Sequence, residues 1–368
     1  MKTGRTLVEL AKEIERQQNT KRDFVAPTTA IQMQPIRADD AAAVQLHLGN
    51  GDGVDVGLND IAHGQIAEHV KIPAAYYKRM REEAPDLLAT NVNRWFAKYP
   101  AKRMVRTLDG KARAFLSDGY RPLENADLAE AVMPTLLGMR LEIMSCEITE
   151  RRLYIKAVDE RIKKDVPTGR RIGDGSHVFF DTCSPAIIIS NSEVGMGRLT
   201  VDTGIFTKVC TNLATIAGAG MKRTHVGARH ELTDGEHLRE LLTDETKAAT
   251  DKAIWMQVRD VVQGAFDEVR FANNTQKLAA MAEQKIEGDP VKVVELTAKH
   301  FTLNDGERQG VLRHLIEGGD LTRYGLFNAI TRTAQDLPDY DRATEFERFG
   351  GQVVELPRNQ WNELAVAA

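Results

Sequence analysis

Apolar residues recur at helical spacing at the start of the chain and again around residue 60. In the first stretch the apolar positions are Leu7, Leu10, Ala11 and Ile14, which predicts a short amphipathic helix. Residues 58–85 predict a hairpin of two helices that breaks before Pro73. Asn59 or Asp60 is the expected cap of the first helix, because both side chains accept hydrogen bonds from free backbone N–H groups.

Alternation of apolar and polar positions predicts strands in the middle of the chain. Residues 102–108 and 111–118 indicate a β-hairpin that turns at Asp109 and Gly110. A helix capped by Asn125 is expected next, followed by two strands within residues 141–160. The glycines Gly195 and Gly197 lie between two further apolar runs, where a hairpin turn is expected rather than a phosphate-binding loop.

The last part of this pattern predicts three strands followed by a helix. Residues 161–177 are polar and basic and contain Gly and Pro, which predicts a loop. Residues 205–220 predict a helix with Cys210 on its apolar face, and the chain is nearly all helical from about residue 236. The predicted fold is α+β: a helical N-terminal hairpin, an antiparallel β-sheet with a β-β-β-α core, and a mostly helical C-terminal part.

The predicted organisation has three parts. Residues 1–57 form an N-terminal arm, residues 58–235 an α+β core domain, and residues 236–368 a helical C-terminal region. Apolar residues make up 42% and charged residues 28% of the chain, as in ordinary globular proteins. No apolar run is long enough to cross a bilayer, and the N-terminus has no apolar segment typical of secretion. We therefore expect a cytoplasmic protein without a membrane partner.

Motifs for chemical catalysis are incomplete. The stretch from His230 begins like the zinc-protease motif HExxH, but Asp234 replaces the second histidine. The sequence offers other possible zinc ligands, but their spacing does not define a zinc site. They are His225, His230, Cys146, Cys183 and Cys210. Cys210 and Ser192 lack a neighbouring base or a nucleophile elbow. The sequence favours a protein without catalysis and without a cofactor.

A metal-dependent nuclease remains the enzymatic alternative. Nucleases of this kind place carboxylates on neighbouring strands so that Mg²⁺ and a general base converge. The usual spacing is missing, because Tyr154 stands where an acid would precede Lys156. The carboxylates open to a non-standard site are Asp118, Glu142, Glu147 and Asp159.

Charge is distributed unevenly along the chain. The net charge is −4, but residues 91–230 carry a net +7 and residues 231–368 a net −9. Within the basic part, residues 94–121 and 151–171 hold eight Lys or Arg each, and the first stretch is interleaved with aromatics. Cations that contact phosphates and aromatics that stack on bases are typical of single-stranded nucleic-acid binding. The alternative is that aromatics such as Phe115 are core residues and the cations are only solvated.

The candidate nucleic-acid-binding residues follow from these two stretches. They are expected to line one groove beside the predicted strands, with Tyr99 and Tyr120 as stacking residues. The set is Arg94, Lys98, Tyr99, Lys102, Arg103, Arg106, Arg113, Tyr120, Arg121, Arg151, Arg152, Lys156, Lys163, Lys164, Arg170 and Arg171.

Three blocks of the sequence resemble the phage/plasmid-like protein family, which is catalogued as a domain of unknown function. They are "FLSDGYRPLEN" at 115–125, "NSEVGMGRLTVDTGIFTKVCTN" at 191–212 and "YGLFNAITRTAQDLPDYDRATEFERFGG" at 324–351. The resemblance covers most of the chain, but Leu213 follows Asn212 where the family usually has glycine. It implies an origin on phages, prophages or plasmids and no established chemistry.

The predicted order of three strands and a helix is similar to the core of Rad52-like single-strand annealing proteins. That similarity implies a basic groove for single-stranded DNA and assembly of subunits into rings or filaments. Our leading hypothesis is therefore a homo-oligomeric, single-stranded DNA-binding protein of a mobile element that promotes strand annealing or recombination. The alternatives are the nuclease and a non-enzymatic protein that binds a host partner through its acidic C-terminal helices. The pattern predicts no role for Asn212.

Overall fold

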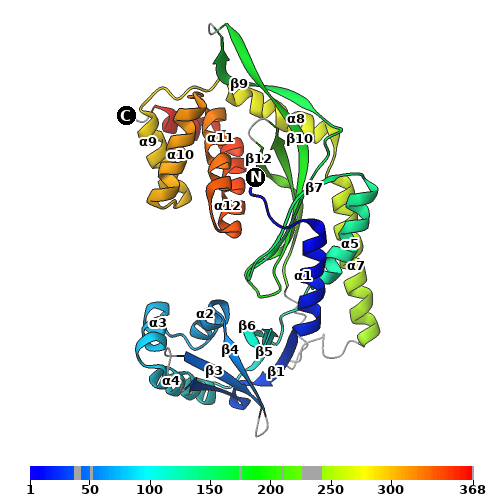
Figure 1. Cartoon of the computed structure of the whole chain (residues 1–368), viewed down its shortest axis with the longest axis vertical. Helices are drawn as coiled ribbons and strands as arrows, with labels where there is room; N and C mark the ends of the chain where they lie inside the picture. The colour runs from blue at the N-terminus through cyan, green and yellow to red at the C-terminus, as the bar shows by residue number, and fades with distance from the viewer. Residues whose placement is uncertain (37–42, 50–52, 174–175, 209–210, 226–242, 367–368) are drawn as a thin grey trace.

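The protein contains two six-stranded sheets and a set of helices that follow them in the chain (Figure 1). The computed structural model describes residues 1–36, 43–49, 53–173, 176–208, 211–225 and 243–366. The predicted α+β class is confirmed, with helices before and after the strands. None of the helices among these residues is both long enough and apolar enough to cross a membrane.

The first sheet has the strand order β1-β5-β6-β4-β3-β2 and lies at the bottom of Figure 1. Its neighbouring strands run antiparallel except for the parallel pair of β4 and β6. Alternate residues such as Ile31 and Met33 are buried, so one face packs on three helices. The strands are β1 (Arg22–Pro27), β2 (Ile31–Ile36), β3 (Ala43–Leu48), β4 (Val54–Leu58), β5 (Lys102–Leu108) and β6 (Lys111–Ser117). The helices are α2 (Asp60–His69), α3 (Ala74–Glu83) and α4 (Pro85–Lys98).

The second sheet has the order β12-β11-β10-β8-β7, and β9 pairs with the first half of β10. Both faces are covered: Ile187 packs toward one set of helices, and Ile188 faces the opposite side. The strands are β7 (Glu142–Ile148), β8 (Leu153–Val158), β9 (Lys164–Ile172), β10 (His177–Asn191), β11 (Leu199–Thr207) and β12 (Asn212–Arg223). One face carries α1 (Leu7–Thr20), α5 (Asn125–Gly138) and α7 (Asp244–Gly264).

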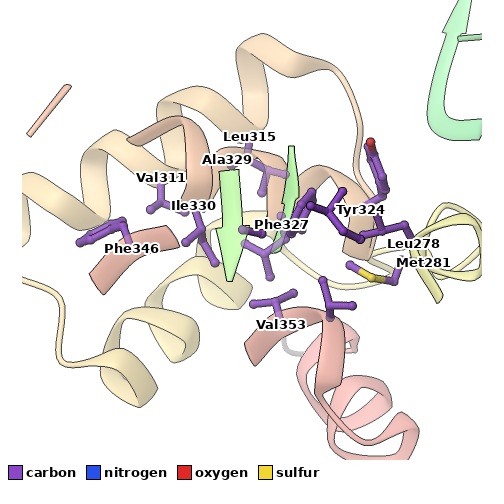
Figure 2. Close-up of a cluster of buried hydrophobic side chains, with 14 of the residues drawn as sticks. Leu278, Met281, Val311, Leu315, Tyr324, Phe327, Ala329, Ile330, Phe346 and Val353 are labelled. Carbon is purple, nitrogen blue, oxygen red and sulfur yellow. The ribbon is translucent and has the colours of Figure 1, made fainter. Parts of the chain in front are cut away.

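The C-terminal helices pack on the other face and on one another. Figure 2 shows their shared core, to which α8, α10, α11 and α12 each contribute apolar side chains. Its residues include Leu278, Met281, Val311, Leu315, Tyr324, Phe327, Ala329, Ile330, Phe346 and Val353. The helices are α8 (Glu268–Met281), α9 (Pro290–Phe301), α10 (Asp305–Gly318), α11 (Arg323–Asp336), α12 (Tyr340–Glu355) and α13 (Arg358–Ala365).

Several local predictions are confirmed. The hairpin of α2 and α3 forms, and the Asn59 side chain accepts a hydrogen bond from the N–H of Ala62 at 2.9 Å. Asp109 and Gly110 turn the β5–β6 hairpin with positive φ values of 51° and 74°. The loop between β10 and β11 turns through Gly195 at φ 75°, as expected of the glycine pair. A Cβ at Gly195 would lie 2.7 Å from Leu116, so the loop also needs glycine to pass close to β6.

Two local predictions are wrong. Residues 205–220 were expected to form a helix, but residues 205–207 end strand β11 and residues 212–220 belong to strand β12, and the next described helix is α7. The apolar run around Ile205 and Leu213 is buried on both sides of the sheet, and periodicity cannot distinguish such a strand from a buried helix. The basic segment expected to be a loop contains strand β9, whose ladder to β10 overrides its Pro and Gly content. Cys210, which was predicted on the apolar face of the helix expected over residues 205–220, lies outside the described residues.

The predicted N-terminal arm also differs from the structure. Strands β1, β2, β3 and β4, which lie within residues 22–58, pair into the first sheet, and α1 packs against the second sheet. The predicted core domain is therefore divided between two sheets. Asn125 is the first residue of α5, and the preceding Glu124 takes the N-cap position without a capping side-chain bond.

Asn212, for which the sequence predicts no role, ties β12 to α11. It is fully buried, and its amide nitrogen lies 3.3 Å from Oδ1 of Asn328. Its own Oδ1 accepts a hydrogen bond from Gln335 at 2.8 Å. A buried amide with partners on both sides fixes one register of helix against sheet.

A fully buried ion pair joins the second sheet to α12. Lys156 on β8 donates to Glu347 at 2.7 Å and lies 4.5 Å from the ring centre of Tyr340. Both charged side chains have no exposed area, and burial lowers the pKa of Lys156 against the opposing charge of Glu347. Removing one partner leaves an uncompensated buried charge.

We expect Lys156→Met to lower the free energy of unfolding by about 3–5 kcal/mol, because Glu347 would remain charged and buried. The double variant Lys156→Met/Glu347→Leu should recover most of that loss, since both charges are gone. Urea unfolding of the wild type and both variants measures the difference. A single variant as stable as the wild type would contradict this account.

Candidate functional site

The loop that links β10 to β11 is inserted between the two sheets. Three successive backbone carbonyls of this loop accept hydrogen bonds from side chains of the first half of the chain. Tyr120 donates to Ser192 at 2.9 Å, Arg106 to Glu193 at 2.9 Å, and Gln65 to Val194 at 2.7 Å. Side chains from α2, from β5 and from the segment after β6 therefore hold the β10–β11 loop at one point, which we call the inter-sheet lock (residues 192–194 with their partners).

The side chain of Glu193 continues the lock. It is 4% exposed, accepts a hydrogen bond from Arg113 at 2.7 Å, and caps the backbone N–H of Asn125 at 2.7 Å. The neighbouring Asn191 donates to Leu123 at 2.7 Å and to Asn125 at 2.9 Å. The block "NSEVG" thus contacts the block "FLSDGYRPLEN" directly.

Arg106 is the centre of the charge network. Its side chain has no exposed area and binds Asp23 at 2.9 Å and Glu124 at 2.5 Å, in addition to the Glu193 carbonyl. A planar guanidinium carries donors in several directions, which suits a residue that joins three partners. Lys21 adds a second cation at 2.6 Å from Glu124.

Two of the three carboxylates of the network, Glu124 and Glu193, differ in their pKa. Burial opposes ionisation of Glu124, but Arg106 and Lys21 outweigh it and lower the pKa of Glu124 to about 2. Burial and the nearby charge of Glu124 raise the pKa of Glu193, although Arg113 and Arg106 oppose the rise. A shared environment with separated pKa values is common in active sites and in structural ion networks alike.

Four of the predicted DNA-binding residues are buried inside the protein. Arg106, Arg113 and Tyr120 belong to the inter-sheet lock, and Lys156 pairs with Glu347. Their exposed fractions are 8% or less, so they are not surface contacts for phosphates or bases. The sequence predicted the three cations among them on the surface, but they pair inside the protein with Glu124, Glu193 and Glu347.

A second group is partly buried and has polar partners. Arg103 lies 2.6 Å from Nδ1 of His69 and 5.8 Å from the ring centre of Phe115. Arg152 donates to Ser190 at 3.1 Å, and Arg121 pairs with Asp251. These side chains connect different helices and strands of the protein to one another.

The remaining candidates form two exposed surfaces. The first, which we call the α4 patch, contains Arg94, Lys98, Tyr99 and Lys102. Tyr99 is 60% exposed and stacks on Trp95 with ring centres 5.8 Å apart, and Lys98 lies 5.3 Å from both ring centres. Arg151 lies apart from this patch, exposed in the turn between β7 and β8.

The second surface is the β9–β10 arm, formed by β9 and the paired residues 177–183 of β10. It carries Lys164, Arg170 and Arg171, with Lys163 immediately before it, and Phe180 is 53% exposed. Figure 1 shows β9 at the top of the molecule and α4 at the bottom, so one groove does not gather both surfaces.

The cations of the two surfaces differ from the buried ones in their partners. Across the described part of the chain, no carboxylate lies within ion-pair distance of Arg94, Lys98 or Lys102. The same holds, within those residues, for Lys164, Arg170 and Arg171. Exposed cations without a carboxylate partner are able to bind an external anion.

The carboxylates of the nuclease alternative do not converge. Asp159 pairs with Arg161 at 2.6 Å, and Glu147 pairs with Arg5. Asp118 and Glu142 are exposed. Among the described residues, no group of three or more His, Cys, Asp or Glu side chains is arranged to hold a metal ion.

The candidate zinc ligands are also separate where they are described. Cys146 and Cys183 are buried, and burial raises the pKa of Cys146 to about 11. His225 stacks on Tyr120 with ring centres 5.3 Å apart, and burial lowers its pKa to about 4. His230 and Cys210 lie outside the described residues.

Sequence reasoning missed the acidic members of the lock. Glu193, Glu124 and Asp23 were not candidate residues, although two of them lie in the blocks that the sequence marks as distinctive. The signal available in the sequence was Glu193 in one distinctive block and two arginines, Arg106 and Arg113, shortly before the other block. Periodicity does not reveal such long-range pairs.

A scan against models of protein families, a search of curated proteins and a search of solved structures each gave no match. The resemblance to the phage/plasmid-like family and to Rad52-like proteins therefore stays a prediction.

We expect Arg106→Met to lower the free energy of unfolding by about 3–5 kcal/mol, because Asp23 and Glu124 would lose a buried partner. Arg79→Met is the matched control, since Arg79 pairs with Glu83 on the exposed side of α3. Denaturant unfolding should show a much smaller loss for this control. Equal losses in both variants would contradict a special role for Arg106.

The lock also predicts acid sensitivity. Glu124 has a lowered pKa in the folded state, so its stabilising effect is complete above its usual pKa near 4.5 and is lost as the pH falls toward about 2. We expect the stability difference between wild type and Glu124→Gln to shrink over this range. Urea unfolding at a series of pH values measures it, and a difference that stays constant with pH would contradict the assignment.

Proposed function

We propose that the protein binds single-stranded DNA through its exposed cationic surfaces and promotes strand annealing without chemical catalysis. The observation that carries the proposal is the set of exposed cations without carboxylate partners on the α4 patch and the β9–β10 arm. Each surface has an exposed aromatic beside its cations, Tyr99 in one and Phe180 in the other. Cations with stacking aromatics suit single strands, because every base has a face on which an aromatic ring can stack.

Two separate surfaces suit a protein that brings two strands together. In Figure 1 the two surfaces lie at opposite ends of the molecule, so each is able to hold its own strand. In this proposal the inter-sheet lock keeps the two surfaces in a fixed relation. The resemblance to the phage/plasmid-like family supports a setting on mobile elements, where annealing proteins are useful.

Reversing the arm cations tests the proposal. We expect Lys164→Glu/Arg170→Glu/Arg171→Glu to weaken binding of a fluorescein-labelled single-stranded oligonucleotide. Each lost phosphate contact should flatten the slope of log affinity against log salt by about 0.7, or about 2 for the three together. Fluorescence anisotropy between about 50 and about 200 mM salt measures both quantities.

The matched control changes the net charge equally at another place. Lys78→Glu/Arg79→Glu/Arg81→Glu reverses cations that already pair with Glu82, Glu83 and Asp60. We expect this variant to keep nearly the wild-type salt slope. No binding by the wild type at low salt, or equal losses in both variants, would overturn the proposal.

A further inference from the structure

Arg348 on α12 is a half-buried cation to which the structure gives no counterion. Among the described residues, its guanidinium has no hydrogen bond and no carboxylate within ion-pair distance. The two glutamates nearest to it along the helix have other partners, since Glu347 pairs with Lys156 and Glu345 with Arg342. Removing water from a charged group without giving it a partner costs free energy, so this position favours an anion from outside the chain.

A second arginine lies beside Arg348. Burial lowers the pKa of Arg152, which precedes β8, and the positive charge of Arg348 lowers it further, so the two side chains are close neighbours. Within the described residues, Arg152 also has no carboxylate at ion-pair distance. It donates to the Ser190 hydroxyl at 3.1 Å. A guanidinium has five N–H donors, so Arg152 keeps donors for a ligand.

The turn between β10 and β11 sets the position of Arg152. A Cβ at Gly197 would overlap the guanidinium of Arg152, so the turn needs glycine there for this side chain to lie across it. The Ser190 hydroxyl that accepts from Arg152 also lies 2.9 Å from the hydroxyl of Thr200 on β11. Both strands that meet at the turn therefore hold the guanidinium in place before a ligand binds, which reduces the cost of binding.

One carboxylate lies near the two arginines. Asp341, at the start of α12, accepts hydrogen bonds from the hydroxyls of Tyr154 at 2.8 Å and Thr149 at 3.2 Å. Its negative charge opposes the effect of Arg348 on the pKa of Arg152, but the effect of Arg348 is the larger one. Two cations therefore share one carboxylate that is already engaged elsewhere, and an excess of positive charge remains.

We propose that Arg152 and Arg348 form a phosphate-binding site between the β10–β11 turn and α12. The oxygens of a phosphate group accept from the planar donor forks of both guanidinium groups, a geometry that arginine provides and lysine does not. The bound phosphate supplies the missing counterion of Arg348 and offsets the repulsion between the two cations. The site uses neither the α4 patch nor the β9–β10 arm, so it does not depend on the proposed function. Its phosphate belongs either to the backbone of a strand or to a free phosphomonoester.

Thermal unfolding with inorganic phosphate tests the site. At constant ionic strength, we expect phosphate to raise the melting temperature of the wild type in a saturable manner, because a ligand that binds only the folded state stabilises it. Arg152→Met and Arg348→Met should each weaken the apparent phosphate affinity by at least about tenfold, since each removes charged hydrogen bonds. The matched control is Arg259→Met, because Arg259 pairs with Asp260 on α7, on the opposite face of the second sheet. It should keep the wild-type phosphate affinity.

The stability of the variants without phosphate separates ligand binding from a structural role. Arg348→Met removes an unpaired cation, so we expect its free energy of unfolding in phosphate-free buffer to equal or exceed that of the wild type. Arg348→Lys keeps the charge but not the planar fork, and it should bind phosphate with an affinity between those of the wild type and Arg348→Met. A large loss of stability in both variants would show that Arg348 supports the fold and would overturn the site.

Two ligands distinguish the sources of the phosphate. One is an oligo(dT) strand without terminal phosphates, and the other is thymidine monophosphate. A loss of at least about tenfold in strand affinity in Arg152→Met/Arg348→Met supports the site and identifies the strand backbone as its ligand. A loss for the monophosphate alone supports the site and identifies a free phosphomonoester. No stabilisation of the wild type by inorganic phosphate, or no loss for either ligand in the double variant, overturns the site and leaves the proposed function to its own arm variants.

Discussion

The insertion of three loop carbonyls into the first sheet is the contact on which the rest of the structure depends. Ser192, Glu193 and Val194 present their carbonyls to three side chains from different elements. Backbone carbonyls buried between two sheets need donors, and here the donors come from α2, from β5 and from the segment that follows β6. Their pairing makes the two halves of the chain one cooperative unit, because neither sheet can leave without exposing unsatisfied polar groups.

The same requirement explains where the arginines of the middle segment lie. A loop with a buried Glu193 needs cations, and Arg106 and Arg113 supply them on neighbouring strands of the first sheet. The basic stretch of residues 94–121 therefore contains both buried arginines that pair with carboxylates and exposed cations without carboxylate partners. Charge counting along the chain cannot separate the two, because paired and unpaired arginines look alike in a composition.

The sequence predicts most helices, the first hairpin and the α+β class, because these depend on local periodicity and turn residues. It fails at β12 and β9, where the outcome depends on partners far along the chain. Leu213 and Ile216 lie in a strand covered on both faces, and this produces a continuous apolar run without a period of two. The lock was not predicted for the same reason, since Glu193 meets Arg113 only in the folded chain.

Buried and exposed cations of this protein have different roles. Arg106 and Lys156 each hold a buried carboxylate, so their removal changes stability before it changes any binding. Lys164 and Arg171 have no carboxylate partner among the described residues, and they lie on an arm that its pairing with β10, the buried Asp320 and the packing of Val166 against the C-terminal helices hold in place.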